Sequence, residues 1–97
     1  MKYGVRLQGE NYELEIDGKK KPFGFITTIF VKAKTVEEAE IAAVNLVRND
    51  VLLNGLMISG SPYISTLRST EIWEERWWKR LGGKGYSFFP MEKDNEI

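Results

Sequence analysis

The chain has 97 residues, of which 42% are hydrophobic, and its 14 basic and 14 acidic residues give a formal net charge of zero. This length and composition indicate one globular domain and exclude a disordered or fibrous chain, while the charge balance argues against a dedicated nucleic-acid binder. The absence of His and Cys removes thiol nucleophiles, disulfides and the usual zinc, haem and iron–sulfur ligands. We therefore expect no cofactor.

The N-terminal third of the chain predicts three strands. Residues 2–8 and 12–17 alternate apolar and polar side chains, which is the period of a half-buried strand. The residues between them, 9–11, are short enough for a hairpin connection, and Asp17-Gly18 is a second turn signal. The run 23–33 is apolar on both faces, as expected of a central strand that a helix covers on at least one side.

A helix is expected to follow at once. Thr35, with Glu38 three residues later, forms the pattern of a capping box. An apolar stripe at helical spacing would then face the sheet, comprising Val36, Ala39, Ala43, Leu46 and Val47. Asn54-Gly55 is expected to end the last turn.

The C-terminal part predicts two further strands. Residues 63–73 are rich in β-forming side chains, with Tyr63, Leu67 and Trp73 on one face, and residues 86–89 form a last short strand. The predicted order is β-β-β-α-β-β, so residues 1–91 form a single α+β domain with one mainly antiparallel sheet and one helix packed on one face. Residues 92–97 form a charged tail that we expect to be disordered.

The most unusual segment interleaves tryptophans with basic side chains. The candidate binding surface comprises Trp73, Arg76, Trp77, Trp78, Lys79, Arg80, Lys84 and Tyr86. Trp and Arg are frequent at binding hot spots, and tryptophans are equally good core material, so core, subunit interface and ligand surface stay open. If residues 71–78 continue as a strand, parity makes Trp77 the inward and Trp78 the outward side chain.

Lys84-Gly85-Tyr86-Ser87-Phe88-Phe89 resembles the first RNP motif of RNA-recognition domains. Lys84, Gly85, Tyr86 and Phe88 fit that motif, whereas Ser87, Phe89 and Met91 depart from it. The resemblance implies binding of RNA or single strands through residues 76–89, and packing of Tyr86 and Phe88 in the core is the alternative.

Carboxylates are the remaining acid–base groups. Glu13 with Glu15, and Glu74 with Glu75, are the candidate pairs for acid–base chemistry. Mg²⁺ accepts oxygen ligands alone, and Glu13, Glu15 and Asp17 are the nearest to a cluster that could hold it. Alternating acidic residues are also what the solvated face of a strand requires. We expect this solvated role, no metal site and no enzymatic activity.

Four segments together resemble a small family of bacterial proteins of unknown function: residues 9–12, 24–33, 37–40 and 85–90. The resemblance carries no catalytic residues. No stretch approaches the roughly 20 apolar residues of a membrane span, and the N-terminus lacks the apolar core of a signal peptide. The sequence thus favours a non-enzymatic cytoplasmic interaction module that binds a protein partner or its own copy, with nucleic-acid binding as the alternative and no role at a membrane.

Overall fold

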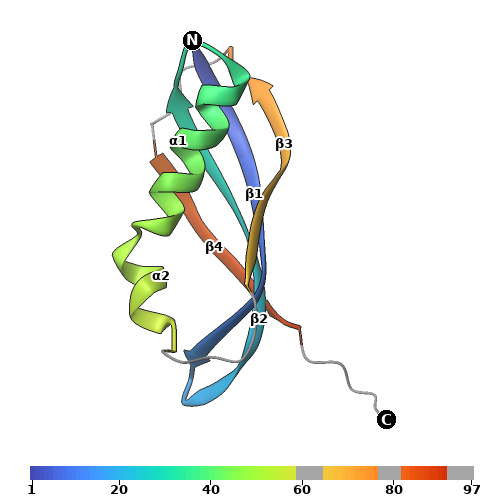
Figure 1. Ribbon diagram of the computed structural model, residues 1–97, viewed down its shortest axis with the longest axis vertical. Coiled ribbons are helices and arrows are strands. Elements are labelled where there is room, and N and C mark those ends of the chain that lie inside the picture. The colour runs from blue at the N-terminus through green and yellow to red at the C-terminus, as the bar shows by residue number, and fades with distance from the viewer. Residues whose placement is uncertain (59–64, 77–81, 92–97) are drawn as a thin grey trace.

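The structure, a computed structural model, describes residues 1–58, 65–76 and 82–91, with residues 82–84 as backbone alone. Its four strands form one antiparallel sheet in the order β3-β1-β2-β4. The elements in chain order are β1 (Lys2–Ile16), β2 (Lys19–Lys32), α1 (Val36–Arg48), α2 (Val51–Leu56), β3 (Thr66–Glu74) and β4 (Gly82–Pro90). Both helices lie on the same face of the sheet (Figure 1). The predicted α+β class and antiparallel sheet are confirmed, and the predicted element order is only partly right.

The first strand is longer than predicted, and the hairpin expected at residues 9–11 is wrong. The pairing of β1 with β2 shifts between Gly9 and Tyr12, so two residues of β1 lie opposite one residue of β2. Asn11 has a φ of 61°, a left-handed conformation that Asn tolerates better than most residues. The predicted turn is therefore a β-bulge inside a continuous strand. The hairpin before the helices is at Asp17-Gly18, where both φ angles are positive, as a type I′ turn requires.

The helix begins at the predicted N-cap, Thr35, but the second bond of the capping box comes from the N–H of Lys34 and not from that of Thr35. The Glu38 backbone N–H donates to Thr35 Oγ1 at 3.1 Å, and Glu38 Oε1 accepts from the Lys34 N–H at 3.3 Å. The predicted stripe is buried in part: Ala39, Ala43 and Val47 are buried, whereas Val36 and Leu46 are 46% and 49% exposed.

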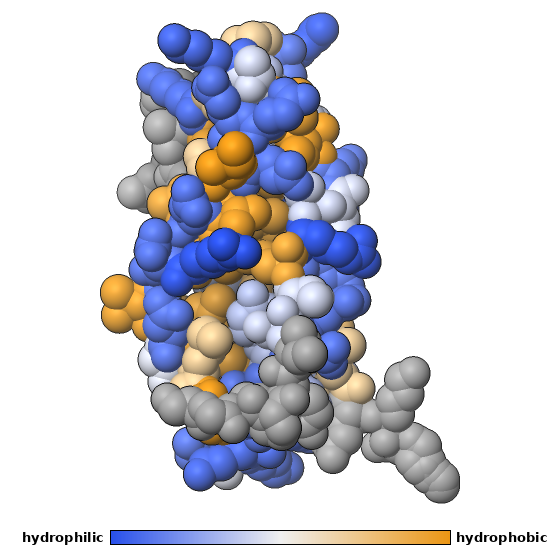
Figure 2. All heavy atoms as spheres, viewed as in Figure 1, coloured by the Kyte–Doolittle hydropathy of each residue, from blue (hydrophilic) through white to orange (hydrophobic). Residues whose placement is uncertain are grey.

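The first helix, α1, ends at Arg48, which is earlier than expected. Asp50 starts α2 as its N-cap by accepting from the Leu52 N–H, so Asn54-Gly55 lies within a second helix and not at the end of the first. Apolar side chains emerge between polar ones on this side of the molecule (Figure 2). Val51 and Leu52 in α2 are 84% and 62% exposed.

The core lies between the helices and the sheet, and Phe25 is at its centre. The Phe25 ring is fully buried and makes edge contacts with Tyr12, Tyr86 and Phe88 at centroid distances of 5.1, 5.2 and 6.1 Å. A Cβ atom on Gly9 would lie 2.2 Å from this ring. The aromatic ring thus occupies the space that a side chain at Gly9 would need.

The predicted common face of Leu67 and Trp73 is wrong, because a bulge intervenes. Arg6 pairs with Glu71 and Leu7 pairs with Ser69, which leaves Thr70 unmatched. Leu67 packs against the core, and Trp73 lies on the opposite face. A single extra residue inverts the parity of every later side chain.

The predictions for Trp77, Trp78 and the tail at 92–97 fall outside the described residues. β3 ends at Glu74, and the next two residues, Glu75 and Arg76, are not part of a strand. The continuous strand over residues 71–78, on which the inward and outward assignments depended, is therefore absent up to Arg76. Within the described ranges, no helix has the length and apolar character to cross a membrane.

Candidate binding surface

The face of the sheet opposite the helices, hereafter the open face, has no helix over it among the described residues. The strand register places three neighbouring rows in the middle of this face: Trp73, Gly4 and Phe30; then Glu71, Arg6 and Thr28; then Arg68, Gln8, Ile26 and Ser87. An aromatic row and a row containing Ile26 thus enclose a polar row. Ile26 is 39% exposed.

Trp73 is a fixed aromatic group on the open face. A Cβ atom on Gly4 would lie 2.4 Å from two atoms of the indole, so the ring rests directly on the glycine backbone. The Phe30 ring meets it edge-on at 6.3 Å, and the Trp73 Nε1–H donates to Glu75 Oε2 at 3.3 Å. Large side chains held in one orientation lose little entropy on binding, which suits an interface anchor.

The polar row is centred on an exposed ion pair. Arg6 Nη1 donates to Glu71 Oε1 at 3.0 Å, and both side chains are about half exposed. A hollow of about 400 Å³ adjoins Arg6, Ile26 and Ser87 where β4 bulges at Gly85. Exposed pairs of this kind contribute roughly 0–1 kcal/mol, so Arg6 can exchange Glu71 for another carboxylate at little cost.

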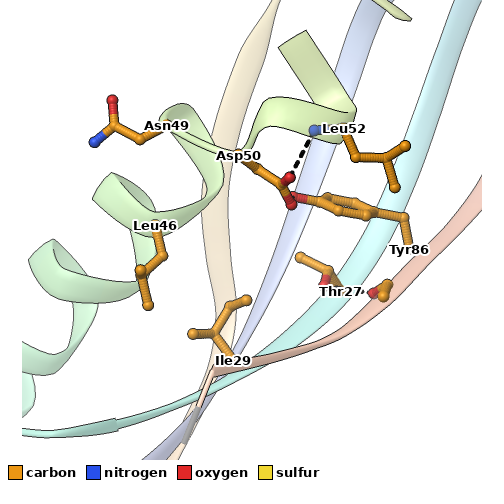
Figure 3. Close-up of a pocket in the computed structure, with 8 residues that line it drawn as sticks. Thr27, Ile29, Leu46, Asn49, Asp50, Leu52 and Tyr86 are labelled. Carbon is orange, nitrogen blue, oxygen red and sulfur yellow. Dashed lines mark hydrogen bonds between the residues drawn. The ribbon is translucent and has the colours of Figure 1, made fainter. Parts of the chain in front are cut away.

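Tyr86 lies on the other side of the sheet, in a cavity between β4 and the helices (Figure 3). Its hydroxyl donates to Asp50 Oδ2 at 2.7 Å, and Asp50 Oδ1 accepts from the Leu52 N–H at 2.9 Å. Burial, followed by the bond to the Asp50 carboxylate, raises the pKa of Tyr86 well above its usual 10.0. Burial also raises the pKa of Tyr12, against smaller lowering effects of Arg48 and Ser65.

The described members of the predicted surface do not lie together. Trp73 is on the open face of one outer strand, Tyr86 is on the helix side of the other, and Arg76 is exposed beyond β3. Lys84 lies in β4, where only its backbone is described. The remaining members of the predicted surface fall outside the described residues: Trp77, Trp78, Lys79 and Arg80.

Sequence reasoning missed the other contributors to both surfaces. These are Arg6 and Ile26 on the open face, and Asp50, Leu46 and Leu52 at the cavity. A glycine within a strand, such as Gly4, could have indicated the position of Trp73, because such glycines often mark a site where another group lies close to the backbone.

The carboxylate pairs line neither the hollow beside Arg6 nor the cavity behind Tyr86. Glu15 is opposite Lys20 across the β1–β2 hairpin, whereas Glu13 is opposite Pro22. Glu75 accepts from Trp73 as described above. In the part of the chain that the structure describes, no three acidic side chains converge as a metal site would require.

The comparisons with known proteins gave no relative: no family model, no curated protein and no solved structure matches the chain. Any assignment of function therefore rests on the geometry of these surfaces.

Proposed function

We propose that the protein is a non-enzymatic interaction module that binds a second copy of itself through the open face. The observation that carries the proposal is the fixed Trp73 ring beside an exposed polar row and the exposed Ile26. Aromatic and arginine side chains flanked by apolar groups are the usual composition of a binding hot spot.

The charge pattern favours a second copy as the partner. A formal net charge of zero removes long-range repulsion between copies. In a twofold arrangement the same patch meets itself, so Arg6 of each copy can meet Glu71 of the other. Each would then exchange a partner within the chain for an equivalent partner across the interface.

The test is the molar mass from light scattering as a function of concentration. We expect wild type to dimerise, Ile26→Arg to remain monomeric because it places an unpaired charge in the interface, and Ile41→Arg to behave as wild type. Ile41 is 61% exposed on α1, so it gives the same substitution on the far side of the molecule. A wild-type chain that stays monomeric to roughly 1 mM, which corresponds to about 4 kcal/mol of association energy, would refute the proposal. Equal weakening by both variants would refute it too.

The nucleic-acid alternative has less support. It requires the Tyr86 ring to stack on a base. This ring already stacks on Phe88, with 5.6 Å between the ring centroids, and its hydroxyl donates to Asp50. We do not propose it.

A further inference from the structure

The cavity behind Tyr86 has the size of a small-molecule site and lies on the helix side of the sheet. It measures about 390 Å³ and lies between α1, α2 and the β2–β4 pair, within the range of roughly 300–1,000 Å³ that ligand pockets occupy. Leu46 of α1 and Ile29 of β2 point toward each other across it (Figure 3). Leu52 of α2 also lines it.

Among the described residues that line this cavity, Asp50 is the one charged side chain. Its two carboxylate oxygens each accept one hydrogen bond, from the Leu52 N–H and from the Tyr86 hydroxyl. A carboxylate can accept about four such bonds, so both oxygens retain capacity. The carboxylate is thus held in place by the protein and is still able to bind a donor.

The C-terminal turn of α1 adds negative potential, whereas the N-terminus of the short helix α2, which Asp50 caps, has the opposite sign. The cavity adjoins the last turn of α1, through Leu46 and the C-cap Asn49, and the C-terminal end of a helix attracts cations. The basic residue of that turn, Arg48, is exposed and does not line the cavity. The Asn49 amide points away from the Asp50 carboxylate (Figure 3).

We propose that this cavity binds a small organic cation, namely a primary alkylammonium. Its ammonium group would donate to Asp50 beside the face of the Tyr86 ring, and its alkyl chain would lie between Leu46 and Ile29. A charge-assisted hydrogen bond and a cation–π contact would act on the ammonium group. The apolar walls account for the preference for an alkyl chain over a bare ion.

The first experiment compares three probes of equal chain length by chemical-shift titration of the ¹⁵N-labelled protein. n-Butylammonium should shift the amide signals of Leu46, Leu52 and Tyr86, and n-butanol and butyrate should bind about tenfold more weakly, because neither offers a cationic donor. Butyrate that binds as tightly as butylammonium would overturn the proposal. Shifts spread over the whole surface would overturn it too.

The second experiment removes the charge and keeps the cap. In Asp50→Asn the side chain remains an equally good N-cap and can still accept from Leu52, so the fold should persist while affinity for n-butylammonium falls about tenfold. Asp17→Asn is the matched control, since it makes the same change in the β1–β2 turn, where Asn-Gly is as favourable as Asp-Gly. Equal affinities of Asp50→Asn and wild type would overturn the proposal, and so would equal losses in both variants.

A third variant keeps the test decisive if Asp50→Asn is destabilised. Leu46→Trp fills the cavity from a side chain that is already 49% exposed, and should abolish the localised shifts without removing any charge. Undiminished binding to this variant would place the ligand elsewhere and refute the assignment.

Discussion

Gly9→Ala tests how closely the core packs against the backbone at Gly9. The added Cβ would lie 2.2 Å from Phe25 Cε2 and 2.4 Å from Cζ, whereas carbon atoms in contact are about 3.5–4.0 Å apart. The Phe25 ring would have to retreat by more than about 1 Å, and it is fully buried between Tyr12 and Tyr86.

Overpacking of this kind lowers the free energy of unfolding by about 1–3 kcal/mol. Replacing a strand glycine by alanine raises it by about 0.5–1 kcal/mol, because alanine reduces the conformational entropy of the unfolded chain. The net loss, centred near about 1 kcal/mol, should lower the melting temperature by roughly 4–8 °C, measured by circular dichroism. Gly55→Ala is the control, because no atom lies within 4 Å of its new Cβ in α2, and it should raise the free energy of unfolding by up to about 1 kcal/mol. A Gly9→Ala protein that melts at or above the wild-type temperature would show that the ring has room, and would refute the reasoning.

Three further predictions concern single hydrogen bonds. Thr35→Ala should lower the free energy of unfolding by about 1 kcal/mol in denaturant titrations because α1 loses its cap, and Thr35→Ser should restore most of it; unchanged stability in the alanine variant would contradict the capping assignment. Burial and Asp50 raise the pKa of Tyr86 above the 10.0 of an unperturbed tyrosine, so the unfolded chain loses this proton first and wild-type stability should fall as the pH rises above about 10. Tyr86→Phe should flatten that fall, and an identical alkaline profile would rule the linkage out. Thr27→Val should cost about 1–2 kcal/mol, since the buried hydroxyl donates to the Gly85 carbonyl at 2.6 Å; a melt that matches wild type would mean that this bond contributes no net stability.

The features predicted correctly from the sequence are those specified by neighbouring residues. The capping box depends on side chains three residues apart, and the turn at Asp17-Gly18 depends on two adjacent residues whose types tolerate a positive φ. The N-cap at Thr35 and the turn were both found where they were expected.

The errors arise at bulges, which depend on distant strands. Asn11 and Thr70 each shift the pairing of β1 by one residue, and local composition does not distinguish an inserted residue from a turn or a regular strand. The first shift made one strand look like two, and the second moved Trp73 to the open face. The bond between Tyr86 and Asp50 joins residues 36 apart in the sequence, so no local pattern could pair them.

The same irregularities affect how this sheet can grow. Of its two outer strands, β3 is interrupted at Thr70 and β4 at Gly85. A strand added from another molecule could match each edge for a few residues before its hydrogen bonds lost register. Templated addition of strands, which is the elementary step of cross-β fibril growth, is therefore disfavoured at both edges of the sheet. A chain without net charge can then be concentrated with a lower risk of seeding amyloid from its folded state.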